Sequence, residues 1–177
     1  MGDYVPFPPE PGAHSRDTPA EKAQRRARVL LVDDSRHDII LAKYFLLGAG
    51  GVDCDLGTAQ SCGEAMAALS QAADAGRPID LVLLDINMPG DSGFALMDRI
   101  RADPRLRHTP VIMCTSSGLD LDRSQARHRG AVGYMQKPPS PEKFRHILEH
   151  LPVLNLYEEE AGMRLTAIAA DPAPLSA

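Results

Sequence analysis

Four short apolar runs of this chain each end directly in polar residues that can take part in chemistry. In order along the chain, VLLV precedes Asp33 and Asp34, LVLL precedes Asp85, PVIMC precedes Thr115 and GYMQ precedes Lys137. Short continuous apolar runs with helical patterns between them are typical of parallel strands buried on both faces. Ligands bind at the carboxyl ends of such strands, so the polar residues are predicted to share one edge of one sheet.

The residues at this edge indicate a particular chemistry. The carboxylates of Asp33, Asp34 and Asp85 repel one another, and they tolerate burial together only if a cation holds them. Oxygen sites rich in carboxylate favour Mg²⁺, which takes few protein ligands and completes its shell with water and phosphate oxygens. The hydroxyl of Thr115 and the ammonium group of Lys137 would suit phosphate oxygens. The set predicts Mg²⁺-dependent transfer of a phosphoryl group to a carboxylate.

Taken together, these motifs resemble the receiver domain of two-component response regulators. The resemblance covers roughly residues 27–150 and rests on Asp33-Asp34, the segment LLDINMPGDSG (83–93), Thr115-Ser116 and Lys137-Pro138. The chain most resembles the stand-alone receivers that serve phytochrome-type histidine kinases. That narrower resemblance rests on the segments AADAGRP (72–78) and RADPRLRHTP (101–110).

The resemblance implies roles for single residues, with Asp85 as the nucleophile that accepts the phosphoryl group. Asp34 would bind the metal directly and Asp33 through water. Asn87, two residues after the nucleophile, would add its backbone carbonyl to the same ion. The backbone N–H of Ser116 would approach the phosphate, and Tyr134 would be the switch aromatic, whose ring enters the space that Thr115 leaves.

The family's lysine-proline pair implies a cis peptide bond between Lys137 and Pro138, and such bonds are essentially confined to proline. Pro139 follows where the family more often has an apolar or aromatic residue.

The alternation of runs and helical patterns predicts an α/β fold. Five strands and five helices would form a three-layer, doubly wound, flavodoxin-like receiver fold with a five-stranded parallel sheet in the order 2-1-3-4-5. Residues 27–151 are the predicted receiver domain. Residues 1–26, rich in proline, are predicted to be a disordered tail, and residues 152–177 a C-terminal extension.

The C-terminal extension carries apolar residues at intervals of three and four, which predicts an amphipathic helix over residues 153–169. These residues are Leu154, Tyr157, Ala161, Leu165 and Ile168. An isolated helix of this length is marginal in water, so it needs a surface to pack on. Two possibilities stay open: the helix packs on its own domain, or it reaches a second copy and contributes to a homodimer.

Bulk properties narrow the class of protein. The formal net charge of −5 offers no basic surface for nucleic acid, and no apolar run approaches the length of a membrane span. Cys54, Cys62 and Cys114 are odd in number and lack metal-ligand spacing, which favours reduced thiols and a cytoplasmic protein.

Three functions compete. The first is a single-domain response regulator that accepts phosphate from a histidine kinase onto Asp85 and is not otherwise an enzyme. The second is a Mg²⁺-dependent phosphatase with an aspartyl nucleophile, which usually carries a second aspartate where this chain has Asn87. The third is a receiver-like interaction module that is never phosphorylated, which the complete set of site residues disfavours.

Overall fold

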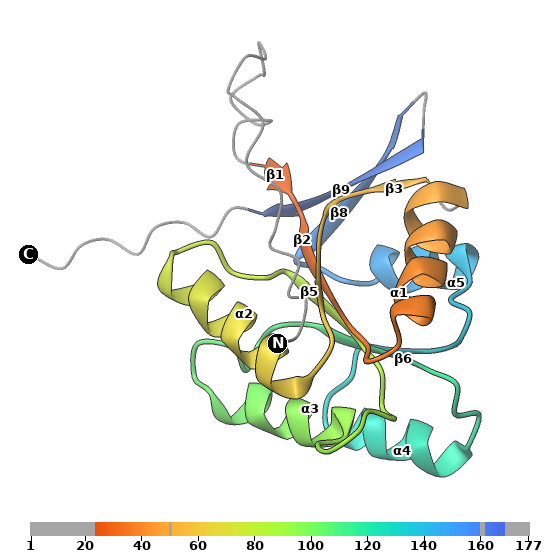
Figure 1. Ribbon diagram of the computed structural model, residues 1–177. Coiled ribbons are helices and arrows are strands. Elements are labelled where there is room, and N and C mark those ends of the chain that lie inside the picture. Colours follow the sequence, from red (N-terminus) through yellow and green to blue (C-terminus); the bar gives the residue numbers. More distant parts are fainter. Residues whose placement is uncertain (1–23, 50, 160–161, 169–177) are drawn as a thin grey trace, which may run out of the picture.

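The protein is described by a computed structural model that covers residues 24–49, 51–159 and 162–168. Its centre is a five-stranded parallel sheet in the order β4-β2-β5-β6-β7, with helices on both faces (Figure 1). In chain order the predicted strands thus lie in the order 2-1-3-4-5, so the predicted fold is confirmed. The strands are β2 (Arg28–Val32), β4 (Asp55–Ala59), β5 (Leu81–Leu84), β6 (Val111–Thr115) and β7 (Gly133–Gln136).

Five helices cover the two faces of this sheet. They are α1 (Arg36–Lys43), α2 (Cys62–Asp74), α3 (Gly93–Ala102), α4 (Asp120–His128) and α5 (Pro141–Glu149). Alternate residues of a strand point to opposite faces. Leu30 and Val32 therefore join the core cluster under α2 and α3, whereas Val29 and Leu31 join the cluster under α1 and α5. Both faces of β2 are buried, as its uninterrupted apolar run predicts.

Serine side chains begin four of the helices, because a serine oxygen can accept one of the unpaired N–H groups of a first turn. Ser61 accepts from the N–H of Glu64, and the Glu64 carboxylate accepts from the N–H of Gln60. Ser35 caps α1 in the same way. A π-helix, Tyr44–Ala49, follows α1 directly.

A second sheet, which the sequence analysis did not predict, lies at the amino-terminal ends of β2 and β4. It consists of β1 (Gln24–Arg26), β3 (Val52–Asp53), β8 (Leu154–Glu159) and β9 (Gly162–Ile168). A single residue separates β1 from β2, and a single residue separates β3 from β4. β9 pairs antiparallel with β1 and parallel with β3, and β8 pairs antiparallel with β9 (Figure 1). The C-terminal segment therefore fills the gap that opens where β2 and β4 begin.

The helix predicted over residues 153–169 is wrong, because the described part of this segment is the hairpin β8-β9. Its apolar residues also recur at intervals of two, as strands require. Leu154 and Leu156 on β8, and Leu165 and Ala167 on β9, pack in the cluster under α1 and α5. The hairpin thus buries its apolar side chains against its own domain.

The predicted tail of residues 1–26 also needs correction, because residues 24–26 form β1 and hydrogen-bond to β9. The edge that β9 offers explains why this short segment is ordered as a strand. Residues 1–23 and 169–177 lie outside the described part of the chain, as does Ala161 of the predicted helix. No helix within the described ranges is long and apolar enough to cross a membrane.

Candidate functional site

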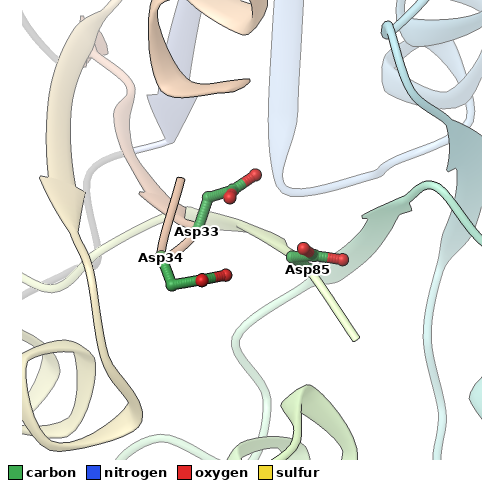
Figure 2. A group of neighbouring side chains, drawn as sticks. All are labelled: Asp33, Asp34 and Asp85. Carbon is green, nitrogen blue, oxygen red and sulfur yellow. The ribbon is translucent and has the colours of Figure 1, made fainter. Parts of the chain in front are cut away.

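Three carboxylates meet at the carboxyl ends of two neighbouring strands. Asp33 and Asp34 follow β2, and Asp85 follows β5 (Figure 2). One oxygen from each of the three carboxylates lies within 4.8 Å of the others. Asp33 and Asp85 are buried, whereas Asp34 is exposed. The predicted acidic cluster is therefore brought together at one edge of the sheet.

Lys137 reaches this cluster from the end of β7. Its Nζ lies 2.6 Å from Asp33 Oδ2 and 2.8 Å from Asp85 Oδ2. The same Nζ donates to Asp38 Oδ2, at 2.8 Å, from the first turn of α1. An ammonium group has three N–H donors, and three carboxylates accept from this one.

Burial and these ion pairs shift the pKa values of the site residues in opposite directions. Burial raises the pKa of the Asp33 carboxyl above its ordinary value, and the hydrogen bond from Lys137 opposes the rise only in part. Burial lowers the pKa of Lys137, but its hydrogen bonds to Asp33, Asp38 and Asp85 outweigh burial and raise the pKa above its ordinary value. Lys137 is therefore a cation at neutral pH.

The donor set fits a hard divalent cation. Asp33, Asp34 and Asp85 offer only carboxylate oxygens, the ligands that Mg²⁺ prefers, and a single ammonium group faces more than one carboxylate. These three residues would hold such a cation. The contribution predicted for the backbone carbonyl of Asn87 stays a prediction.

Thr115 closes β6 and is fully buried. Its hydroxyl oxygen accepts from the side-chain amide of Asn87 at 3.4 Å and from the N–H of Ser117 at 3.3 Å. The N–H of Asn87 in turn donates to Asp85 Oδ1 at 3.2 Å. Asn87 thus links the predicted nucleophile to the predicted phosphate-binding hydroxyl. The role predicted for the N–H of Ser116 stays a prediction.

Tyr134, the predicted switch aromatic, lies on β7 and is buried, with 9% of the residue exposed. Its hydroxyl donates to the carbonyl oxygen of Ser117 at 2.9 Å, and the guanidinium of Arg123 lies 5.3 Å from the ring centroid. Burial raises the pKa of the Tyr134 hydroxyl. Tyr134 therefore contacts the loop that follows Thr115. A switch residue would need such a contact to respond to a movement of Thr115.

One residue at the site, Asp38, was not singled out from the sequence. Asp38 lies within a helix rather than at a strand end, so the strand-end pattern could not find it. Gly93, the first residue of α3, packs against the backbone of Asp85. The sequence analysis did predict the cis peptide bond between Lys137 and Pro138, which the structure confirms.

The comparison with protein families agrees with this geometry. The profile of the response regulator receiver domain matches residues 29–149. The chain belongs to this family. The matched range contains every site residue described above, so the resemblance stated from the motifs is confirmed for this receiver.

Individual relatives differ in length. The two-component response regulator ORR41 of Oryza sativa subsp. japonica is 34% identical over 126 residues, which cover 71% of this chain and 94% of the relative. A probable cyclic di-GMP phosphodiesterase of Vibrio cholerae is 37% identical over 117 residues, which cover 63% of this chain but only 23% of the relative. The receiver thus spans nearly the whole of one relative and less than a quarter of the other.

Solved structures share the fold. The bacteriophytochrome response regulator AtBRR matches with a TM-score of 0.66 and 26% identity, over 77% of this chain and 99% of that chain. This likeness agrees with the narrower resemblance drawn from the sequence, to the stand-alone receivers of phytochrome-type kinases.

Proposed function

We propose that this receiver accepts a phosphoryl group on Asp85 from a histidine kinase in a Mg²⁺-dependent reaction. The observation that carries the proposal is the contact of 2.8 Å between Asp85 Oδ2 and Lys137 Nζ inside the acidic cluster. A carboxylate oxygen of Asp85 would attack phosphorus while the bond from phosphorus to the histidine nitrogen breaks. The cation, when bound, supplies charge that offsets the repulsion between the carboxylates and the phosphoryl oxygens.

The remaining residues would hold the transferred group. Lys137 supplies a point charge to one phosphoryl oxygen, and the Thr115 hydroxyl and the N–H of Ser116 would donate to others. For this, Thr115 must turn away from Asn87, which its hydroxyl contacts at 3.4 Å. Its movement would be felt at Ser117, whose N–H and carbonyl contact Thr115 and Tyr134. Phosphorylation would thus reach the surface of α4 and β7.

The partner would be a histidine kinase, of the phytochrome type if the likeness to AtBRR extends to function. The protein would then be a cytoplasmic phosphoacceptor that catalyses only its own phosphoryl transfer and slow dephosphorylation. The phosphatase alternative has less support, because Asn87 stands two residues after Asp85 and an amide cannot act as a general acid.

The homodimer remains a prediction, but its original basis has changed. It rested on a helix with an exposed apolar stripe, and the hairpin β8-β9 instead buries Leu165 and Ala167 in its own domain. A dimer would need another surface, or an exchange of the hairpin between two copies.

An experiment on intact mass tests the phosphoacceptor function. The full chain is incubated with a small acyl phosphate, with Mg²⁺ or with chelator, and the mass gain of one phosphoryl group is followed. We expect a gain with Mg²⁺ only, and none in Asp85→Asn. Asp120→Asn, which removes a carboxylate that no contact joins to the cluster, serves as the control and should behave as wild type. A gain that persists in Asp85→Asn would reject the assignment.

A further inference from the structure

A fourth carboxylate, Asp38, contacts the site without belonging to the acidic cluster. Its Oδ2 accepts from Lys137 Nζ at 2.8 Å, while the group of carboxylates within 4.8 Å of one another consists of Asp33, Asp34 and Asp85. Asp38 also differs in its surroundings, since its side chain is 33% exposed and those of Asp33 and Asp85 are 3% and 5% exposed.

The position of Asp38 is fixed by the start of α1. Ser35 caps this helix by accepting from the backbone N–H of Asp38, at 3.2 Å. The loop that leads to the cap is itself held by the cluster, because the N–H of Ser35 donates to Asp33 Oδ1 at 3.0 Å. The Asp38 carboxylate is therefore held at a defined place beside the ammonium group.

Two of the three carboxylates that accept hydrogen bonds from Lys137 also have another role in the site. Asp33 and Asp85 would both bind the cation, and Asp85 would also take the phosphoryl group. An ammonium group that pairs with these two carboxylates competes with a cation for the same oxygens. Asp38 has no such other role, so it can keep the ammonium group paired when the other two acceptors are engaged.

We propose that Asp38 is a positioning residue that holds the Lys137 ammonium group and thereby lets Asp33 and Asp85 bind a divalent cation. The proposal rests on the proposed function insofar as the cation is the one used in phosphoryl transfer. Asp38 acts through Lys137 and is not itself a ligand. Without its charge, Lys137 pairs more closely with Asp33 and Asp85 and hinders the cation.

Calorimetric titration of the full chain with MgCl₂ tests this coupling. Asp38→Asn keeps the shape of the side chain and removes its charge, and it should weaken Mg²⁺ binding about five-fold. Lys137→Ala removes the competing ammonium group and should bind Mg²⁺ more tightly than wild type. In the Lys137→Ala background, Asp38→Asn should change the affinity by less than about two-fold, because the residue through which it acts is gone.

The control is Asp120→Asn, which removes an equal charge from the first turn of α4 and should stay within about two-fold of wild type. Circular dichroism shows whether each variant is folded. Equal weakening by Asp38→Asn with and without Lys137 would mean that Asp38 acts by its charge on the ion, and would overturn the proposal. Unchanged affinity in Asp38→Asn, or no Mg²⁺ binding by the wild type, would also overturn it.

The phosphodonor assay is scored separately. A wild-type chain that binds Mg²⁺ with the coupling described, but gains no phosphoryl mass, would reject the proposed function and support the role of Asp38. A chain that gains the mass but shows no coupling would support the proposed function and reject the role of Asp38.

Discussion

Gly93 lies directly against the backbone of Asp85. A Cβ added to Gly93 would overlap the carbonyl oxygen of Asp85, and it would lie 2.9 Å from the carbonyl carbon of Asp85 and 3.0 Å from Cα of Ile86. These neighbours are backbone atoms, which cannot turn aside as a flexible side chain can. Gly93 is buried at the first position of α3, so the helix begins where only a residue without a side chain fits.

This contact predicts that Gly93→Ala disturbs the site as well as the fold. The added methyl group must push the Asp85 loop away from α3, which should cost about 2–4 kcal/mol of unfolding free energy. Mg²⁺ binding should weaken too, because Asp85 belongs to the acidic cluster. Urea unfolding followed by circular dichroism, with a Mg²⁺ titration, measures both effects.

Gly63→Ala is the matched control. Gly63 lies in α2 with its nearest neighbour, the Ser61 hydroxyl, 3.9 Å from an added Cβ, so the methyl group has room. The change should stabilise the helix by about 0.5 kcal/mol, because alanine has the higher helix propensity. If Gly93→Ala and Gly63→Ala were equally stable, close packing would not explain why position 93 is a glycine.

The sequence predicted the central sheet and the cluster because both depend on the same local signal. Buried parallel strands must be continuously apolar, and their carboxyl ends must meet, so the order of residues alone was enough to place Asp33 and Asp85 together. Lys137 followed from the same reasoning, and the structure brings it to the cluster. Asp38 could not be found in this way, because a carboxylate in a first helical turn is an ordinary surface feature.

The hairpin escaped prediction for a different reason. Leu154, Tyr157 and Leu165 fit a helical period, but Leu154, Leu156, Leu165 and Ala167 fit a strand period equally well. What decides between the two is the unpaired edge at β1 and β3, which is a property of the tertiary fold.

The raised pKa of Asp33 predicts that this carboxylate costs stability when no cation is bound. Burial raises the pKa of Asp33, so the folded chain holds this proton more tightly than the unfolded chain does. The stabilisation from this group is therefore present below the unfolded pKa of about 3.9 and is lost as the pH rises through the folded pKa. At pH 7 in chelator, Asp33→Asn should be more stable than wild type by roughly 1 kcal/mol.

Urea unfolding of both proteins across the acid and neutral range measures this difference. The advantage of Asp33→Asn should shrink as the pH falls through the raised pKa of the folded carboxyl toward the unfolded pKa of about 3.9. Added Mg²⁺ should stabilise the wild type more than the variant, because Asp33 belongs to the cluster. A variant less stable than wild type at pH 7 would show that the ion pair with Lys137 outweighs the cost of burial.

The contact between Thr115 and Ser117 predicts how phosphorylation would reach Tyr134. Thr115→Val keeps the buried shape and removes the hydroxyl that accepts from the Ser117 N–H at 3.3 Å. Losing that acceptor should cost about 1–2 kcal/mol of unfolding free energy, since Thr115 lies in the core rather than at a surface edge. The variant should still gain the phosphoryl mass but lose the phosphorylation-dependent change in the NMR signals of the Tyr134 ring.

Thr115→Ser is the matched control, because it keeps the hydroxyl and removes only the methyl group. It should retain the change at Tyr134. If Thr115→Val retained the change as well, the signal would reach β7 by another route.

The last prediction concerns the hairpin. Leu165 on β9 is fully buried in the cluster under α1 and α5, so Leu165→Ala should cost about 2–4 kcal/mol of unfolding free energy. Tyr157→Ala on β8 is the control, since its side chain is 42% exposed and its loss should cost about 1 kcal/mol or less. Thermal melts at several protein concentrations also test whether the hairpin stays in its own chain. A midpoint independent of concentration is expected for packing within one chain, and a midpoint that rises with concentration would indicate that two copies exchange the hairpin, because association then contributes to stability.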